Sequence, residues 1–345
     1  MRVRLAESGD QKSWDSYVSS HPDSTNCHLF GWKQIIAKTY AHPGFYLIAE
    51  ENGGTVGVLP LIHMKSLLFG SHLVSMPFLN YGGPLGDSEQ IVQKLVQEAT
   101  FLARQKRAKT IQFRQLEQAR TSSLDFSIRK DKVRMVLDLP ESAETLFKSF
   151  KAKLRSQIRK PQKEGCHAVI GGLELLDDFY KVFSINMRDL GSPVHSRTLF
   201  RWILTVFAHE ARICVVFHKS LPVAGGIVIC HKKGMEIPWA SSLRDSKGLA
   251  SNMLLYWTLL EYACNNSLES FDFGRSTKGE GTFKFKEQWG ARPEELNWTT
   301  IPATGSAPVP AGGHDRLRSF ERIWKMAPVP IANLVGPLVR GLISL

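Results

Sequence analysis

The chain has 345 residues, of which 43% are hydrophobic and 22% charged, a balance typical of globular proteins and unlike that of disordered chains. This length allows two ordinary domains, each with its own core. The net charge is +12 at pH 7, which favours an anionic partner but does not choose among a nucleic acid, a phosphorylated sugar and an acidic membrane surface.

The cysteine pattern argues against a disulfide-linked secreted protein and against a zinc protein. They are scattered without a C-x-x-C pair, and several lie in apolar runs, so we expect buried thiols in a reducing compartment. No close Cys/His spacing offers a tetrahedral set, so no metal site is expected. The N-terminus MRVRLAESGD lacks an apolar signal segment, which predicts a cytoplasmic protein.

Apolar periodicity in the first half predicts one α/β unit. The expected elements are helices between residues 14 and 40, a hairpin of 45–49 and 56–62 around Asn52-Gly53-Gly54, a strand at 73–76, an amphipathic helix at 89–107 and a strand at 110–114.

The second half repeats this plan of helices, hairpin, strand, helix and strand, which suggests duplication without a residue-level repeat. The expected elements are a strand at 134–139, helices at 175–190 and 197–208, a hairpin of 211–218 and 223–231, a strand at 234–241, a helix at 249–265 and a strand at 270–273.

A basic segment joins the two halves. Between Lys148 and Lys163 there are seven basic residues and no acidic one, along an apolar stripe of Phe147, Phe150, Leu154 and Ile158. This pattern predicts an amphipathic helix, which Pro161 should end near Lys160. The cationic face is either a solvated surface or a site for a phosphate-bearing ligand. Candidate phosphate ligands are Arg155, Arg159 and Lys160.

Two loops carry other candidate residues. Tyr81, in the turn LNYGGP, could hydrogen-bond a substrate or serve as a core tyrosine. Trp239, Arg244, Asn252 and Tyr256 are expected to cluster around the loop SSLRDSKGLASN (241–252) and the helix that follows it. A serine hydrolase is disfavoured because G-x-S-x-G is absent, and His42 and His195 near turns are expected to be structural.

The segment FDFGRSTKGEGTFKFKEQWG (271–290) is the most informative. It predicts a strand that breaks at Gly274, a loop carrying Arg275 and Lys278 into solvent, and a short helix that contains Lys286. Asp272 would be a base or, more often for a strand residue near Arg275, an ion-pair member. Cations and flexible backbone at a strand end are typical of an anion or oxyanion site, but also of a surface loop with solvated lysines.

The order of D-F-G-R-S, a Gly-rich loop and F-K-x-x-W-G resembles the Fem (FemAB) aminoacyltransferases. The resemblance extends over FGWKQII, LVSMPFLNYGGPLG, KAKLRSQIRKPQKEG and NMRDLGSPVHSRTLF, and is strongest to the FemAB-related proteins of exosortase (PEP-CTERM) and exopolysaccharide systems. It implies an α/β (α+β) fold of two tandem GNAT-like domains, with mixed, mostly antiparallel sheets flanked by helices. The expected bounds are 1–140 and 141–303, followed by a linker and apolar tail at 304–345.

The resemblance also implies acyl or aminoacyl transfer to an amine of a cell-envelope or exopolysaccharide precursor. Lys286, next to Phe285, would stabilise the oxyanion, while the basic helix would hold phosphates. Residues expected on the acceptor side are Trp32, Lys33, Tyr81 and Arg275, and further substrate contacts are expected from Trp239 and Asn252. Gly248 stands alone without an R-x-x-G-x-G pattern, as in relatives that use aminoacyl-tRNA, so the donor is expected to be aminoacyl-tRNA or acyl-CoA, with no bound cofactor.

Two alternatives of other classes stay open. One is a non-catalytic module that binds nucleic acid or another polyanion through the basic helix. The other is a peripheral membrane scaffold held by the tail, at the inner face of the membrane. Prolines, glycines and Arg340 interrupt residues 326–345 too often for a spanning helix, so the tail either packs on the body, which is favoured, or lies against a membrane.

Overall fold

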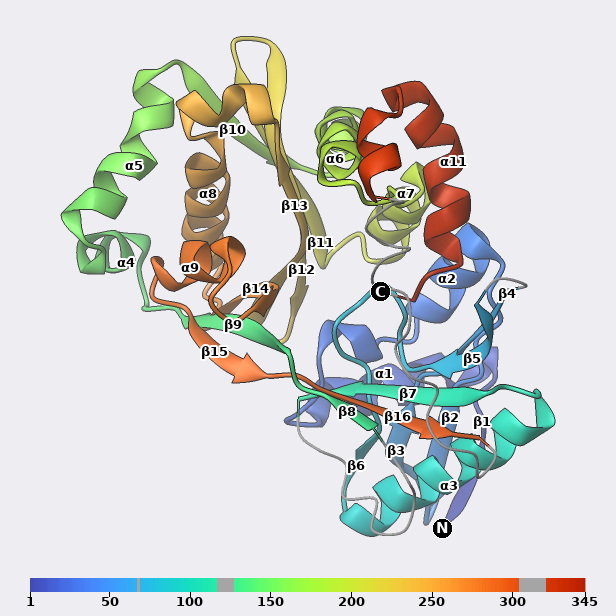
Figure 1. Ribbon diagram of the computed structural model, residues 1–345. Helices are drawn as coiled ribbons and strands as arrows, with labels where there is room; N and C mark the ends of the chain where they lie inside the picture. Colours follow the sequence, from blue (N-terminus) through green and yellow to red (C-terminus); the bar gives the residue numbers. More distant parts are fainter. Residues whose placement is uncertain (67–68, 117–126, 304–320, 345) are drawn as a thin grey trace. The chain divides into compact units, whose positions relative to one another are not determined.

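The computed structural model describes residues 1–66, 69–116, 127–303 and 321–344 (Figure 1). The chain divides into two compact units. Unit 1 is formed by Met1–Val133, Glu295–Gly312 and Gly341–Leu345, and unit 2 by Arg134–Glu294 and Gly313–Arg340. The sequence-based bounds at 140 and 303 stay a prediction, and the linker predicted at 304–313 lies outside the described residues.

Unit 1 contains an antiparallel sheet with the strand order β1-β2-β3-β6 and a mixed sheet with the order β4-β5-β7-β16-β8. Its elements are β1 (Arg2–Leu5), α1 (Gln11–Ser20), α2 (Trp32–Tyr40), β2 (Leu47–Glu51), β3 (Gly54–Leu59), β4 (Ile62–Ser66), β5 (Gly70–Val74), β6 (Leu85–Gly86), α3 (Glu89–Gln105), β7 (Thr110–Gln115), β8 (Ser127–Arg129) and β16 (Asn297–Pro302). The apolar face of α3 packs with these strands into one core that includes Leu95, Ala99, Ile111 and Phe113.

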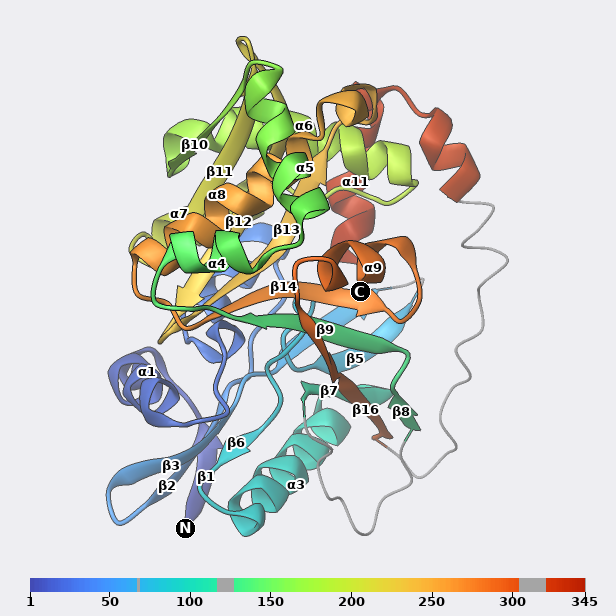
Figure 2. The ribbon, with the colours of Figure 1, turned by 90° about the vertical axis from the view of Figure 1, so that its left-hand side faces the viewer.

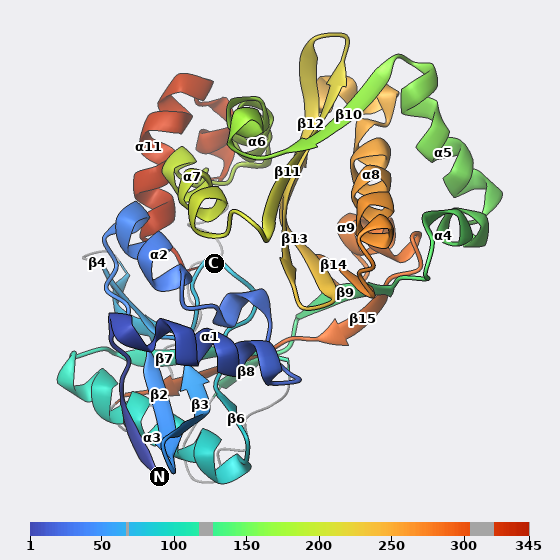
Figure 3. The ribbon, with the colours of Figure 1, turned by 180° about the vertical axis from the view of Figure 1, so that it is seen from behind.

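Unit 2 is built on a seven-stranded sheet with the order β10-β11-β12-β13-β14-β9-β15. Its elements are β9 (Lys132–Asp138), α4 (Ala143–Ser149), α5 (Ala152–Lys163), β10 (Cys166–Gly171), α6 (Leu176–Leu190), α7 (Arg197–Val206), β11 (Ala211–His218), β12 (Leu221–His231), β13 (Gly234–Ser242), α8 (Ser251–Asn265), β14 (Ser270–Thr277), α9 (Gly281–Glu287), β15 (Arg292–Glu295) and α11 (Val329–Gly341). Helices α5 and α8 cover one face of this sheet, and α6 and α7 cover the other (Figures 1 and 3). The predicted mixed sheets flanked by helices are confirmed.

The two units share one strand–helix–strand motif. In unit 1, α3 connects the parallel strands β5 and β7, and in unit 2, α8 connects the parallel strands β13 and β14. Both hairpins expected from the sequence, β2–β3 and β11–β12, are antiparallel as predicted. The duplicated order of elements is therefore a property of the fold.

Two predicted boundaries are wrong. The helix expected from Phe147 to Lys160 is divided by extended backbone at Phe150 and Lys151, and α5 continues through the buried Pro161 to Lys163. A proline in the last turn removes only one main-chain hydrogen bond, so the helix tolerates it there. Strand β14 does not break at Gly274 but reaches Thr277, because glycine adopts the positive φ of 73° that the strand requires at that point.

The described tail, residues 321–344, packs on the body of the protein, which is the alternative that the sequence analysis favoured. In unit 2, Trp324 and Ala332 are buried, and Arg340 Nε donates a hydrogen bond to Nε2 of the fully buried His195 at 3.0 Å. In unit 1, the Gly341 carbonyl lies 2.7 Å from Nε2 of the buried His42. Both histidines are structural, as predicted, and burial holds the pKa of His195 well below its ordinary value.

Two further expectations concern cysteines and membranes. All five cysteines are free, and four of them are buried, as predicted; the fifth, Cys230, is partly exposed. Across the described ranges, no helix has the length and apolar character needed to cross a bilayer. In the same ranges, no group of three or more His, Cys, Asp or Glu side chains could hold a metal ion.

Candidate active site

The parallel strands of unit 2 separate at a defined register. Strands β13 and β14 pair at Gly234–Ser270, Met235–Phe271 and Glu236–Asp272. Beyond this point they continue to Ser242 and Thr277 without pairing with each other, both strands being fully described. Figure 2 shows their different directions. The last paired residues are two carboxylates, each less than a tenth exposed. A polar site thus begins where the strands part.

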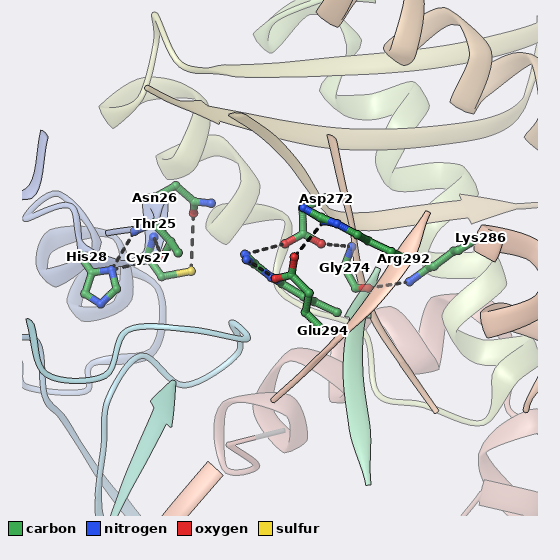
Figure 4. Close-up of polar contacts among 10 residues, drawn as sticks. Thr25, Asn26, Cys27, His28, Asp272, Gly274, Lys286, Arg292 and Glu294 are labelled. Atoms are coloured by element: carbon green, nitrogen blue, oxygen red, sulfur yellow. Dashed lines mark hydrogen bonds and ion pairs between the residues drawn. The ribbon is translucent and has the colours of Figure 1, made fainter. Parts of the chain in front are cut away.

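Gly274 shapes the strand directly after this point. Its positive φ places its N–H on Asp272 Oδ1 at 2.7 Å. Its carbonyl accepts a hydrogen bond from Lys286 Nζ at 3.0 Å (Figure 4), and the Arg275 carbonyl accepts a second one at 2.9 Å. The side chain of Lys286 therefore lies across the parting strand, and the F-K-x-x-W-G segment is attached to the site through its lysine.

The electrostatics of Lys286 are those of a buried ammonium. Its residue is 7% exposed. Burial lowers its pKa to about 8, while the charges of Asp272 and Glu236 act to raise it and that of Arg275 to lower it. An ammonium has three N–H donors, and two are used on the carbonyls, so one is available to an oxygen atom that enters the site.

The carboxylate side of the site belongs to an ion-pair network (Figure 4). Arg134 bonds Glu294 at 2.5 Å and lies 3.9 Å from Asp272. Arg292 contacts Glu294 and Asp138, each at 3.1 Å. The expected ion-pair character of Asp272 is confirmed, and Arg134 of the neighbouring strand β9 is a cation of this pair. Arg275 is half-buried rather than carried into solvent, because the strand does not end at Gly274.

Aromatic packing holds α9 against the strand. The ring of Phe285 lies 5.1 Å from that of Tyr256, and Trp289, which is fully buried, packs edge-on against Phe150 at 5.5 Å. Gly290 ends this turn with φ 89°, a left-handed conformation that favours glycine. These contacts explain the spacing of F-K-x-x-W-G: the aromatic residues four apart anchor the turn, while Lys286 reaches the strand.

The basic helix presents cations without carboxylate partners. Lys148 pairs with Glu144 in α4, but no side chain of the fully described range 151–163 forms an ion pair. Arg159 lies over the ring of Phe147 at 5.0 Å, Arg155 is half-buried and Lys160 is exposed. The positive field that the sequence predicts is therefore uncompensated on α5 itself.

Three candidate residues lie in unit 1 and are held by its own core. Trp32 is buried and donates its indole N–H to the Asn26 carbonyl at 2.9 Å. Lys33 is half-buried, donates to the Ala6 carbonyl at 2.9 Å, and has its pKa lowered mainly by burial. Tyr81 is only 2% exposed. Their substrate-binding roles stay predictions.

Trp239 and Tyr256 do not cluster as expected. Trp239 is buried against Phe200 of α7, with ring centroids 5.3 Å apart, whereas Tyr256 of α8 stacks on Phe273 at 5.4 Å. Phe200 and Tyr256 belong to helices α7 and α8, which cover opposite faces of the sheet (Figure 1). Asn252 is half-buried in the first turn of α8. Successive strand residues face opposite sides, so loop proximity in sequence was a poor guide.

Sequence reasoning missed three buried polar residues at the parallel strand pairs. Glu236 and Ser276 lie in β13 and β14 of unit 2, and the Ser276 hydroxyl has no hydrogen-bond partner. Arg114 lies in β7 of unit 1 and is fully buried. A signal was available for Glu236, which is the single ionisable side chain of the largely apolar strand β13. Arg114 gave no such signal, because its strand β7 also contains Thr110, Gln112 and Gln115.

Comparisons with known proteins agree with this fold. Residues 148–287 match the acetyltransferase (GNAT) domain. No curated protein sequence matches the chain significantly.

Among solved structures, FemX covers 87% of this chain and 97% of its own, with a TM-score of 0.69 and 14% identity. The C-terminal domain of a putative lysylphosphatidylglycerol synthetase from Agrobacterium fabrum covers 86% and 92%, with a TM-score of 0.57 and 13% identity. A tandem GNAT protein from the clavulanic acid biosynthesis pathway covers 88% and 99%, with a TM-score of 0.53 and 13% identity.

Identities this low establish the fold and not the substrate. The match over 148–287 contains α5, the parting strands β13 and β14, and all of α9 with Lys286. The chain therefore has the predicted fold of two tandem GNAT-like domains, similar to the Fem-type structures, and its unit 2 carries the domain of the GNAT acyltransferases.

Proposed function

We propose that unit 2 catalyses N-acyl or aminoacyl transfer, with Lys286 stabilising the oxyanion. The observation that carries this proposal is the geometry of Lys286: a buried ammonium with one N–H left over, fixed by two carbonyls where the parallel strands part. A hydrogen-bond donor that is held in place before the reaction and shielded from water stabilises the charge that develops in a transition state.

The reaction follows from this placement. An acceptor amine attacks the carbonyl carbon of the acyl donor, forming the C–N bond and a tetrahedral oxyanion. This oxyanion accepts a hydrogen bond from the remaining N–H of Lys286. Collapse breaks the C–O bond of an aminoacyl ester or the C–S bond of a thioester, and the proton lost by the amine ends on the leaving oxygen or sulfur. Lys286 acts here in its charged form, which the pKa of about 8 preserves at neutral pH.

The acceptor in this proposal is an amine on an anionic, phosphorylated precursor of the cell envelope or of an exopolysaccharide. The unpaired cations of α5 support an anionic ligand, with Arg155, Arg159 and Lys160 as phosphate contacts. Arg275, which is half-buried in β14, contributes a further positive charge near Lys286. The resemblance to FemAB-related proteins of exosortase systems supports the polysaccharide pathway, with Trp32, Lys33 and Tyr81 on the acceptor side.

The donor is either an aminoacyl-tRNA or an acyl-CoA. The 3-10 turn Arg244–Leu249, before α8, contains one glycine, Gly248, so it lacks the glycine-rich pyrophosphate loop expected of acetyl-CoA enzymes. This supports aminoacyl-tRNA, as does the fold shared with FemX and with a lysylphosphatidylglycerol synthetase domain.

A donor screen tests the proposal. The full chain is incubated with radiolabelled aminoacyl-tRNA or acyl-CoA and an amine-bearing nucleotide sugar, and amide product is measured by chromatography. We expect product with aminoacyl-tRNA. Absence of amide product with every donor would reject the enzymatic function and favour the alternative, a polyanion-binding module, for which the uncompensated α5 face is the supporting observation.

A further inference from the structure

Helix α11 has two faces of different character. Its inner face carries small residues against unit 2: Ala332 is buried, and a Cβ on Gly336 would lie 2.9 Å from Val194 Cγ1. Gly336 therefore permits a close approach of helix and body. This packing fixes which side of α11 faces outward.

The outer face is an apolar stripe, formed by Ile331, Leu334, Val335 and Leu338. These side chains recur at i, i+3, i+4 and i+7, which places them on one side of the helix. They are 54%, 76%, 37% and 72% exposed. A contiguous row of large exposed apolar side chains is uncommon on a monomer and marks a surface that binds something.

The segment that carries the apolar stripe has a positive net charge. From Glu321 to Leu345 the sequence contains one acidic side chain, Glu321, and three basic ones, Arg322, Lys325 and Arg340. The exposed cations Arg322 and Lys325 lie before α11, whereas Arg340 is bonded to the buried His195. Two further exposed apolar residues, Ile323 at 72% and Met326 at 84%, lie among these cations before α11. Large apolar side chains combined with cations are typical of helices that lie in the interface of a membrane containing anionic lipids.

A second copy of the chain is a poorer occupant. Two copies of this net-positive segment would bring mostly like charges together, with Glu321 as its one acidic side chain. One row of side chains on a convex helix also offers a small contact area compared with the roughly 800 Å² that a stable protein interface buries on each partner. A bilayer requires no complementary shape and supplies the opposite charge.

We infer that α11 docks on the surface of a bilayer containing anionic lipids, with the apolar stripe inserted among the acyl chains at the interface. The helix lies along the membrane and does not cross it. This surface is separate from Lys286 and does not depend on acyl transfer, so its test is independent of the enzyme assay.

The test is co-sedimentation of the full chain with vesicles of phosphatidylcholine alone or with about one-third phosphatidylglycerol, a fraction chosen to give a clear negative surface potential. We expect binding to the anionic vesicles, weakened by salt, and at least tenfold weaker for Leu334→Gln/Leu338→Gln. The matched control is Phe101→Gln/Leu221→Gln, which changes two apolar side chains of similar exposure, 58% and 61%, outside the segment. The control should bind as the wild type does.

Three results would overturn the inference: no binding of wild type to anionic vesicles, equal binding by the stripe variant, or equal loss in the control. Light scattering after size exclusion, without lipid, is the second measurement. A dimer that the stripe variant abolishes would assign the surface to a second copy and reject the membrane. Circular dichroism melts of both variants establish that each is folded, since all four substituted side chains are solvent-exposed.

Discussion

The parallel strand pairs of the two units differ at one equivalent position. In unit 1 the last residues paired between β5 and β7 are Val74 and Gln112, and in unit 2 those between β13 and β14 are Glu236 and Asp272. Two residues further along, unit 1 has Arg114 and unit 2 has Gly274. The same step in the fold therefore carries the largest cation in one unit and no side chain in the other.

The consequence is that unit 1 fills the space beyond its strand pair with its own side chain. The Arg114 guanidinium donates to the carbonyls of Met76, Leu79 and Ser344 and stacks on Trp298, with its central carbon 4.1 Å from the ring centroid. In unit 2 the main chain at Gly274 is left accessible to Lys286. One unit is therefore stabilised by its own side chain at this position, and the other keeps a polar site there.

The largest effect is expected from Arg114→Met. The substitution leaves buried carbonyls without donors, each costing about 1–3 kcal/mol, so the free energy of unfolding should fall by about 3 kcal/mol or more. Urea unfolding measures it, with the exposed Arg2→Met as control. Turnover per folded molecule should be unchanged. A folded variant that had lost turnover would instead place chemistry at the strand pair of unit 1.

Lys286→Met tests the polar site of unit 2. Removing the donor that acts in the transition state should lower kcat by about a hundredfold or more, which corresponds to roughly 2.7 kcal/mol. Lys284→Met is the matched control, because Lys284 is exposed on the same short helix. Steady-state kinetics with the donor found in the screen give the result. Equal kcat for wild type and both variants would reject oxyanion stabilisation by Lys286, while the description of the fold would stand.

The substrate role of α5 predicts a smaller effect. Arg155→Gln/Arg159→Gln should raise KM roughly three- to tenfold with kcat nearly unchanged, because contacts to a remote phosphate act equally in ground and transition states. Arg201→Gln/Lys247→Gln removes the same charge from other exposed positions of unit 2 and should change KM little. If both double variants raise KM alike, the effect is one of net charge, and α5 is a solvated face.

Sequence reasoning recovered what local patterns determine. The helix α3 and the hairpins follow from periodicity, and the likeness of the two halves was visible in the order of elements alone. It failed where a residue's surroundings come from distant strands. Gly274 appears locally as a strand breaker, whereas in the sheet its positive φ serves a strand that continues to Thr277. Arg114 appears as an ordinary surface charge, since its acceptors at Leu79 and Ser344 are far away in sequence.

The smallest expected effect is on the pH dependence of the free energy of unfolding. It tests the burial of Lys286 separately from its role in catalysis. The folded protein lowers the pKa of this side chain from 10.5 to about 8, so the unfolded chain binds the proton more tightly. Burying the charge therefore lowers stability below pH 8. This cost falls as pH rises through 8 and is gone above about 10.5.

The quantity to measure is the free energy of unfolding of wild type minus that of Lys286→Met, since other groups that titrate in this range cancel in the difference. It should increase by on the order of 1 kcal/mol between pH 7 and pH 9. Lys284→Met should show no such trend. A difference independent of pH would mean that Lys286 is not desolvated in solution, and a decrease would mean that its carbonyl and carboxylate neighbours hold the proton more tightly than burial expels it. Either outcome would contradict the contrast drawn between the two units, in which Gly274 leaves room for a buried ammonium in unit 2 and Arg114 fills the equivalent position of unit 1.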